Sequence, residues 1–416
     1  MDSHAQTASQ RYYPWLVIAI AFLTVGVAFG ARNAFAVFLI AVVEEFHWSR
    51  GLASGALMAG AILWTLSAPV IGVLLDRYGP RVVLPVGALT MAAGFVVSGL
   101  ARGAAEFYLG MGVLVGVGFA ALTMTSQATF LSNWFVRKRG LAIGAAAAGI
   151  GCGILIVVPL TQRWIAAYGW RAAYFILAAL IAGVIAPLNY IFQRQTPEAL
   201  GLKADFGATA ARPHGAPSAA AASPRLAEAL KTGRFWLFAF GVLAGAIPLH
   251  LVLIHQVAAV SDAGFSRDAA ALGLGMIGLF TAPAMVAMGF LADRIGRQWS
   301  YLLGSASLMA GIFLLLLMGE APQAWLLYAF PPFVAFGFSS RQSLYPTMAA
   351  DLFHGKSFGA IIGAIALFIG AGAGIGPWIG GVMHDATGSY RTAFAAAEAL
   401  AAASIVLIWR AGAKRA

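Results

Sequence analysis

Charged residues are scarce in this chain. Only 10% of its 416 residues are Asp, Glu, Lys or Arg, whereas 61% are hydrophobic and the mean hydropathy is +0.84. Soluble domains carry roughly 25% charged residues, so a soluble fold is excluded. The composition therefore predicts an integral membrane protein, with the lipid bilayer as its main surroundings.

Cysteine and recognisable reaction motifs are also lacking. The single cysteine, Cys152, excludes an intrachain disulfide and a multi-cysteine metal site. The sequence has no nucleotide-binding loop of the form G-x-x-x-x-G-K-[ST] and no discernible catalytic triad. We therefore expect neither an enzyme nor a bound cofactor or metal. The net charge of +11 comes without a basic patch interleaved with stacking aromatics, so we expect no nucleic-acid partner.

Long apolar runs account for most of the chain. A membrane-spanning helix needs roughly 20 apolar residues. By this measure the sequence predicts an all-α membrane protein with twelve transmembrane helices. The predicted spans are 15–43, 53–75, 82–101, 106–131, 141–162, 171–192, 235–259, 270–292, 300–318, 323–349, 358–383 and 391–410.

The basic residues predict how the spans are oriented. Twelve crossings place both termini on one side of the membrane, and the connections on that side hold most of the 26 Lys and Arg residues. They include the run Arg137-Lys138-Arg139, whereas the acids of the opposite connections outnumber the basic residues there. Because basic loops stay in the cytoplasm, we expect both termini to be cytoplasmic, in a bacterial-type inner membrane.

One long connection divides the chain. We expect a cytoplasmic tail at 1–14, a six-helix half at 15–192, a cytoplasmic linker at 193–234, a second six-helix half at 235–410 and a tail at 411–416. Within the linker, 207–224 is rich in Ala, Pro, Gly and Ser and is predicted to be disordered. Residues 223–231 have helix-start signals and predict a short helix on the membrane surface, with coil as the alternative.

A charged, glycine-punctuated turn occurs twice. Gly72-Val-Leu-Leu-Asp76-Arg77-Tyr78-Gly79-Pro80-Arg81 returns in the second half as Gly289-Phe-Leu-Ala-Asp293-Arg294-Ile295-Gly296-Arg297. Such turns cannot lie in hydrocarbon, so each must be a short aqueous link between two spans. Ser49-Arg50 matches Ser266-Arg267 at the same offset in numbering as the turns, and two further segment pairs match at nearly that offset. Matches at nearly one offset predict two pseudo-symmetric halves of parallel topology.

The turn, G-x-x-x-D-R-x-G with an arginine one or two places on, resembles the loop signature of the major facilitator superfamily of transporters. That family carries it between helices 2 and 3 and, in weaker form, between helices 8 and 9. The resemblance implies the major facilitator fold. It also implies gating, in which Asp76 reaches the start of span 358–383 and Asp293 the start of span 141–162 only when the cytoplasmic side is shut. The alternative is a solvated turn that only sets topology. The implied gating residues are Gly72, Asp76, Arg77, Gly79, Arg81, Gly289, Asp293, Arg294, Gly296 and Arg297.

Ionisable side chains lie deep in three spans that the resemblance places around a central cavity. They are Arg32, His250 and Arg341. An arginine at the centre of a spanning helix costs about 2.5–3.5 kcal/mol, and no Asp or Glu lies deep in the cavity spans to offset it. The guanidinium groups therefore favour an anionic ligand, and a carboxylate fits their planar fork. The alternative is that one arginine binds backbone carbonyls at a helix break, or that His250 only fills a kink beside Pro248.

The repeat extends this group of residues. By the offset between the halves, Arg32 corresponds to His250, so the two should face each other across the pseudo-two-fold axis. The same offset pairs Arg341 with Thr123 and Tyr345 with Gln127. The predicted substrate-binding residues are Arg32, Asn33, Thr123, Gln127, His250, Arg341 and Tyr345.

Within the superfamily the chain looks most like the bacterial branch of monocarboxylate-transporter-like proteins. The resemblance rests on Gly30-Ala-Arg32-Asn33-Ala-Phe-Ala-Val-Phe38, on Trp48-Ser49-Arg50 and on Arg137-Lys-Arg-Gly140. That branch typically carries an arginine in the middle of helix 8. Here the corresponding run, Phe280 to Met288, has no charge. The branch's usual anion site is therefore absent, which leaves a lactate-like substrate in question.

These observations predict a secondary active transporter, expected to be a monomer, that moves a small organic anion, a carboxylate, by alternating access. Protons are the expected coupling ion, carried by His250 or by the substrate itself. One alternative is an exporter of drug-like or amphipathic compounds, because Gly372 to Gly381 has the form of the drug-antiporter signature. That signature belongs on helix 5 and here lies in span 358–383. The other alternative is a substrate-sensing receptor, for which the chain offers no large output domain.

Overall fold

The structure is a computed structural model that describes residues 2–136, 138–204, 226–353 and 358–412. Every regular element in these ranges is a helix. The first part of the chain forms α1 (Asp2–Asn33), α2 (Phe35–Phe46), α3 (Arg50–Tyr78), α4 (Pro80–Leu100), α5 (Ala104–Phe107), η1 (Tyr108–Leu114), α6 (Val115–Leu122), α7 (Met124–Trp134), α8 (Arg139–Tyr168), α9 (Trp170–Leu180), η2 (Ile181–Ile185) and α10 (Ala186–Phe192).

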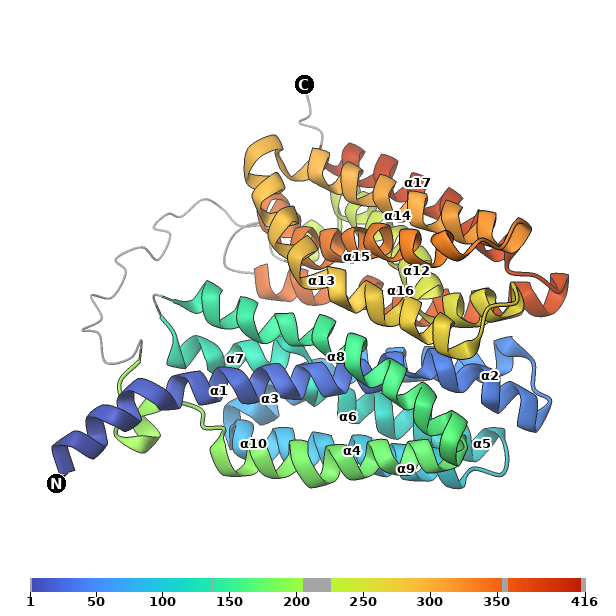
Figure 1. Ribbon diagram of the computed structural model, residues 1–416. Coiled ribbons are helices and arrows are strands. Elements are labelled where there is room, and N and C mark those ends of the chain that lie inside the picture. Colours follow the sequence, from blue (N-terminus) through green and yellow to red (C-terminus); the bar gives the residue numbers. More distant parts are fainter. Residues whose placement is uncertain (1, 137, 205–225, 354–357, 413–416) are drawn as a thin grey trace.

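The second part follows two short elements, η3 (Pro197–Leu200) and α11 (Leu226–Ala229). It forms α12 (Gly233–Asp262), α13 (Arg267–Ile295), α14 (Arg297–Glu320), α15 (Ala324–Phe353), α16 (Phe358–Thr387) and α17 (Arg391–Gly412). The helices lie roughly side by side in two layers (Figure 1). The lower, blue-to-green layer is the first part of the chain, and the upper, yellow-to-red layer is the second.

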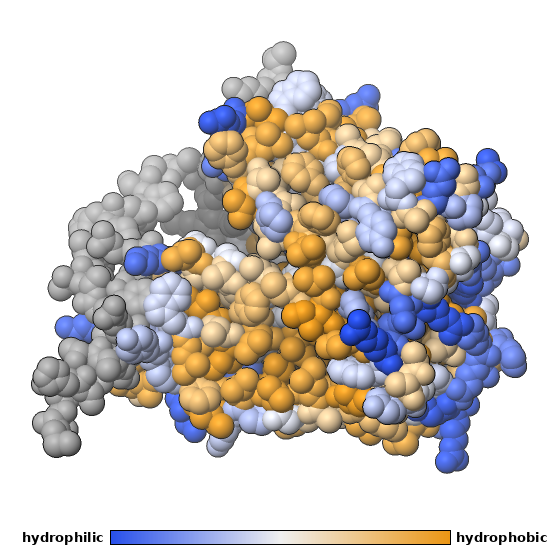
Figure 2. Space-filling view, viewed as in Figure 1, coloured by the Kyte–Doolittle hydropathy of each residue, from blue (hydrophilic) through white to orange (hydrophobic). Residues whose placement is uncertain are grey.

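The flank of the bundle is apolar. Figure 2 shows hydrophobic side chains along the bundle and hydrophilic ones gathered at its right-hand end. Eleven helical stretches in the described chain are long and apolar enough to cross a membrane. The remaining long helix, α15, has 30 residues and contains the polar run Ser339 to Ser343. The predicted spans thus coincide with helices, many of which continue beyond the apolar residues.

Three crossings are built from consecutive helical segments that the sequence did not predict. The first crossing is interrupted at Ala34, between α1 and α2. The fourth is interrupted at Thr123, whose extended backbone (φ −68°, ψ 162°) separates α6 from α7. π-helical turns lie in the fourth and sixth crossings. α1 begins at Asp2, so the helix runs through most of the predicted tail. The predicted disordered segment, 207–224, lies outside the described residues.

Turns and caps follow the sequence repeat. Gly79 and Gly296 end α3 and α13 with positive φ angles of 73° and 85°. Glycine adopts this conformation without the strain that a Cβ would cause. At the other end of the same helices, the hydroxyl of Ser49 accepts from the Leu52 amide at 3.1 Å, and that of Ser266 accepts from the Ala269 amide at 3.2 Å. Both repeat copies therefore build the same helix ends.

Glycine brings helix backbones into direct contact. A Cβ added at Gly153 of α8 would overlap the carbonyl of Gly26 in α1, and one at Gly149 would overlap the carbonyl of Phe22. α8 also meets α13 in the other layer, where a Cβ at Gly151 would overlap the carbonyl of Gly278. Small residues are the usual means of close helix packing in lipid, because burying apolar side chains there gains little.

The two layers meet at one end of the bundle and separate at the other. We call the end with residues 78–80 and 295–297, where the chain termini also lie, the terminal face, and the end with residues 47–50 and 262–267 the distal face. Toward the distal face, a Cβ at Gly374 of α16 would lie 3.1 Å from the Cα of Met58 in α3. Toward the terminal face, Cβ atoms at Gly72 of α3 and Gly363 of α16 would meet nothing within 4 Å. The structure is therefore closed distally and open on the terminal face.

Gly153→Ala should destabilise the protein because the added methyl forces α1 away from α8. Overpacking of this kind costs about 1–3 kcal/mol. Thermal unfolding in detergent should show a lower transition temperature for Gly153→Ala than for the parent. Gly183→Ala is the matched control, since a Cβ there meets nothing within 4 Å and alanine is the better helix former. Equal transition temperatures for the two variants would contradict the packing argument.

Candidate functional site

Arg32 lies in the last turn of α1, and its guanidinium packs against two aromatic rings that also contact each other. The guanidinium carbon is 5.5 Å from the ring centre of Trp64 in α3 and 5.4 Å from that of Phe119 in α6. Cation–π contacts of this kind attract the charge but use none of its N–H donors. Within the described chain, no hydrogen bond or ion pair reaches the Arg32 side chain. Its donors are thus available to a ligand.

His250 lies near Arg32 on α12, shortly after Pro248. Its Nδ1 is 2.9 Å from the carbonyl oxygen of Ala246. A carbonyl only accepts, so Nδ1 carries the hydrogen and the neutral ring presents Nε2 as an acceptor. Arg32 and Arg341 both lie close enough for their charges to act on the imidazole. The structure thus places the predicted Arg32 and His250 in one neighbourhood, contributed by both halves.

Arg341 has different surroundings from Arg32. Its side chain is only 3% exposed and points into the second layer. Nε donates to the carbonyl of Gly245 at 2.8 Å, and Nη1 donates to the carbonyl of Gly337 at 2.9 Å. Nη2 lies 3.4 Å from the hydroxyl of Ser305. In this conformation Arg341 therefore links α12, α14 and α15, and its hydrogen bonds are made with protein atoms.

Tyr345 belongs to the same buried cluster as Arg341. Its hydroxyl is 3.3 Å from that of Tyr301, which in turn lies 2.5 Å from the hydroxyl of Ser404. The cluster fits because Gly245 has no side chain, since a Cβ there would overlap the Tyr345 hydroxyl. Tyr301 and Ser404 were missed by the sequence analysis, because an isolated polar residue in a peripheral span carries no local signal.

The predicted polar residues of the first half lie at helix breaks: Thr123 and Gln127 at the break in the fourth crossing, and Asn33 beside the break in the first. The Thr123 hydroxyl bonds the carbonyl of Ala120 at 3.2 Å, and Asn33 donates from Nδ2 to the carbonyl of Phe29 at 2.9 Å. Gln127 is fully buried, and neither its amide oxygen nor its nitrogen has a partner in the described chain. A buried amide without partners is costly, so Gln127 is the residue of this group best placed to gain from a polar ligand.

The predicted gating carboxylates lie on the open terminal face. Asp76 and Asp293 are both exposed, and neither has an ion pair within the described residues. The loop arginines bond within their own layers: Arg81 donates to the carbonyl of Tyr190 at 3.0 Å, and Arg297 pairs with Asp351. Cβ atoms at Gly140 and Gly359, near the predicted targets of the two carboxylates, would meet nothing within 4 Å. Within the described residues, no hydrogen bond or ion pair joins Asp76 to α16 or Asp293 to α8.

Comparison with known proteins identifies relatives along almost the whole chain. The sequence model of the Major Facilitator Superfamily matches residues 21–260 and 237–415. Monocarboxylate transporter 13 of Bos taurus is 27% identical over 399 residues, which cover 95% of this chain and 88% of that protein. Monocarboxylate transporter 11 of Homo sapiens is also 27% identical, over 91% of this chain and 79% of that protein.

Solved structures give the same result for the fold. A bacterial homolog of the human lysosomal transporter Spinster, in an inward-facing and occupied conformation, superposes with a TM-score of 0.70. The match covers 96% of this chain and 95% of that one, at 16% sequence identity. The predicted twelve-helix architecture is therefore confirmed.

Asp76→Asn should slow transport because it removes the charge that the resemblance assigns to closure of the terminal face. A charge at a helix N-terminus contributes about 0.3–1 kcal/mol, which corresponds to about a two- to fivefold lower rate. Uptake into proteoliposomes measures the rate, and calorimetry should show that substrate still binds. Glu198→Gln, an exposed acid on the same face, is the control. A parental rate for Asp76→Asn would show that the turn only sets topology.

Proposed function

Because the chain belongs to the major facilitator superfamily, we propose that it is a secondary active transporter of a small organic anion with a carboxylate group. The observation that carries the proposal is the Arg32 guanidinium, packed against Trp64 and Phe119 with no anionic side chain of the described residues bound to it. The similarity to proteins named monocarboxylate transporters supports the same class of substrate.

The surroundings of Arg32 explain why an anion would bind there. The two rings, whose centres are 5.3 Å apart, pack against the guanidinium, and the N–H groups on its edge have no partner within the described chain. A carboxylate can accept two parallel hydrogen bonds from that edge. Such bonds are stronger at a site shielded from water than at the surface. Gln127, His250 and Asn33 would then supply the neutral polar groups around the ligand.

The structure also supports a part for Arg341 that differs from a direct clamp. In the conformation seen here its donors are used by Gly245 and Gly337. We propose that Arg341 positions α12, and with it His250, and acts on a bound anion through its charge. A direct contact from Arg341 to the substrate would require it to leave these carbonyls in another state of the transport cycle.

The transport cycle follows from the same arrangement. We propose that the two layers rock about the midplane site, so that the site opens first to one side and then to the other. The terminal face, open in this structure, would be cytoplasmic, because the basic residues of the chain gather there. Protons would be the coupling ion. His250 is the carrier we propose, since the cavity spans hold no deep carboxylate.

Arg32→Gln should weaken binding of the best carboxylate by about ten- to a hundredfold. The loss reflects a charge-assisted contact of about 1.5–3 kcal/mol. Arg32→Lys keeps the charge but loses the planar fork, so it should bind more weakly than the parent and still prefer anions. Calorimetry in detergent over a panel of carboxylates and amphipathic cations measures both effects. Arg102→Gln, in an exposed distal loop, is the control, and parental affinity in Arg32→Gln would contradict the anion site.

Arg341→Gln tests whether Arg341 and Arg32 have different roles. It removes the charge-assisted hydrogen bonds from the guanidinium to the carbonyls of Gly245 and Gly337, each worth about 1.5–3 kcal/mol. We expect a clearly lower unfolding temperature for Arg341→Gln and a smaller loss of affinity than for Arg32→Gln. A variant that is as stable as the parent but binds no carboxylate would instead favour direct contact between Arg341 and the substrate.

His250→Gln should flatten the pH dependence of uptake. A proton carried by His250 makes uptake rise as the pH falls through the pKa that the imidazole has in the transporter. Glutamine keeps hydrogen-bonding capacity but cannot titrate. Initial rates in proteoliposomes with and without a pH gradient provide the measurement, with His255→Gln as a second histidine variant. An unchanged pH profile in His250→Gln would leave the substrate's own carboxyl group as the proton carrier.

A further inference from the structure

The distal face is closed by ion pairs that cross between the halves. Arg50, the first residue of α3, binds Asp262, the last residue of α12, through two contacts of 2.6 and 3.0 Å. Arg267, the first residue of α13, pairs with Glu44 near the end of α2. These four residues line a cleft of about 380 Å³ on this face.

The two ion pairs are related by the sequence repeat. The offset that relates Arg50 to Arg267 also relates Glu44 to Asp262, to within one position. Each half thus supplies one cation and one anion to the other. The pairs are partly exposed: the side chains of Arg267 and Glu44 are 44% and 55% accessible, and those of Arg50 and Asp262 are 18% and 44% accessible. Exposed pairs contribute little, so these two alone hold the face only weakly.

Asp385 of α16 adds a contact that the repeat does not duplicate. Its Oδ1 accepts from the amide of Arg50 at 2.8 Å, and its Oδ2 accepts from the amide of Gly51 at 2.7 Å. A carboxylate of the second half therefore caps a helix of the first half. The equivalent position in the first half is Ile165, by the offset that relates Arg171 to Arg391. The amides of Arg267 and Asp268, at the start of α13, have no side-chain acceptor within the described residues.

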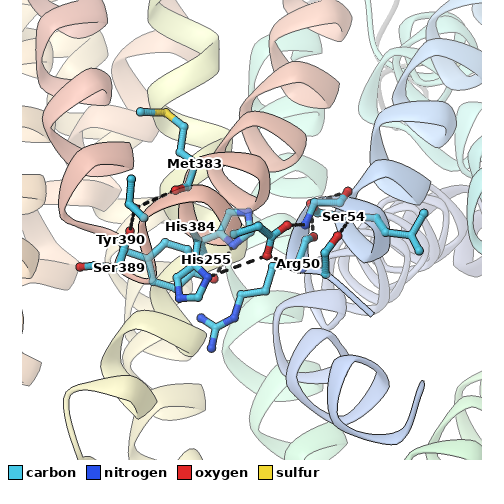
Figure 3. Close-up of polar contacts among 12 residues, drawn as sticks. Arg50, Ser54, His255, Met383, His384, Ser389 and Tyr390 are labelled. Atoms are coloured by element: carbon cyan, nitrogen blue, oxygen red, sulfur yellow. Dashed lines mark hydrogen bonds and ion pairs between the residues drawn. The ribbon is translucent and has the colours of Figure 1, made fainter. Parts of the chain in front are cut away.

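Aromatic and imidazole groups of the second half surround this cap (Figure 3). The Arg50 guanidinium lies 5.1 Å from the ring centre of Tyr390. His255 holds Tyr390 in place: its Nε2 donates to the carbonyl of Pro377 at 2.6 Å, so its Nδ1 accepts from the Tyr390 hydroxyl at 2.9 Å. Burial raises the pKa of Tyr390 well above its ordinary value, so that hydroxyl stays a donor.

We propose that the Asp385 carboxylate is a helix cap that the second half supplies to the first. In this proposal the cap sets the balance between the conformation in which the distal face is closed and the one in which it is open. Two properties make it suitable. A carboxylate satisfies two otherwise unpaired amides and complements the positive end of the α3 dipole, and both effects are lost when α3 and α16 part. The freed amides would then face water, so opening remains possible.

Asp385→Asn tests the proposal with a side chain of nearly the same size and shape as aspartate. The amide nitrogen of asparagine cannot accept a hydrogen bond, so one helix amide of α3 loses its partner and the charge is lost as well. Spin labels at Arg102→Cys and Ala321→Cys, in a Cys152→Ala background, report the distance between the two halves at the distal face. Double electron–electron resonance without substrate should show a ratio of open to closed molecules about two- to thirtyfold higher in Asp385→Asn than in the parent.

Asp268→Asn is the matched control, because Asp268 is an exposed acid in the first turn of α13 on the same face. It should leave the distances unchanged. Arg267→Gln removes an ion pair but no cap, so its shift should be in the same direction and smaller. Asp385→Ala, which removes both acceptor oxygens, is the second variant if Asp385→Asn does not fold, and it should shift the distances in the same direction. A distance distribution for Asp385→Asn equal to that of the parent would overturn the proposal, whatever Arg267→Gln shows. Because no substrate is present, this outcome does not depend on whether the transported ligand is a carboxylate.

Discussion

Backbone contact between glycine-lined helices is the constraint on which the rest of this structure depends. Apolar side chains gain little by leaving lipid for one another, so helices in a membrane associate where their backbones can approach closely. α8 does so on two sides: Gly149 and Gly153 rest on α1 within the first half, and Gly151 rests on Gly278 of α13 in the second half. The contact within the half fixes the position of Arg32, which α1 carries. The contact between halves ends before Gly144 and Gly140, which meet nothing, so α8 and α13 diverge toward the terminal face. One helix thus anchors the site and also serves as the line along which the halves meet.

The fold could be predicted because its signals are local. Spans follow from apolar runs, and the turns at Gly79 and Gly296 follow from residues next to one another in the sequence. The interruptions at Ala34 and Thr123 could not be predicted in the same way. Neither residue is a glycine or proline, and the chain on both sides is helix-compatible. Such breaks arise where a helix adjusts to its neighbours in space, and a single sequence does not record those neighbours.

The candidate site was predicted less completely, for a related reason. By sequence alone Arg32 and Arg341 are equivalent: each is an arginine deep in a predicted cavity span with no acid nearby. The structure separates them because the partners of Arg341 are the carbonyls of Gly245 and Gly337. Every residue has a carbonyl, so residue identities give no sign of this contact. The distal ion pairs are the opposite case, since the repeat that relates Arg50 to Arg267 also relates Glu44 to Asp262. The signal was present, and only the comparison of acidic positions was needed to find it.

Residues that occur in both halves and residues that occur in only one have different roles in the mechanism that we propose. The repeated elements are those that handle the backbone: the Ser49 and Ser266 caps, the glycine turns and the reciprocal distal ion pairs. Two halves with the same helix ends can rock against each other by equivalent motions. The residues that differ between the halves lie where a ligand would bind or where one conformation would be favoured over the other. Arg32, which keeps its charge, corresponds in the repeat to His250, whose imidazole can gain or lose a proton. Asp385 stands opposite an isoleucine in the repeat, so the distal contact is stronger on the α3 side than on the α13 side. In this proposal, the symmetric elements would supply the motion, and the departures from symmetry would determine what is bound and which conformation is favoured.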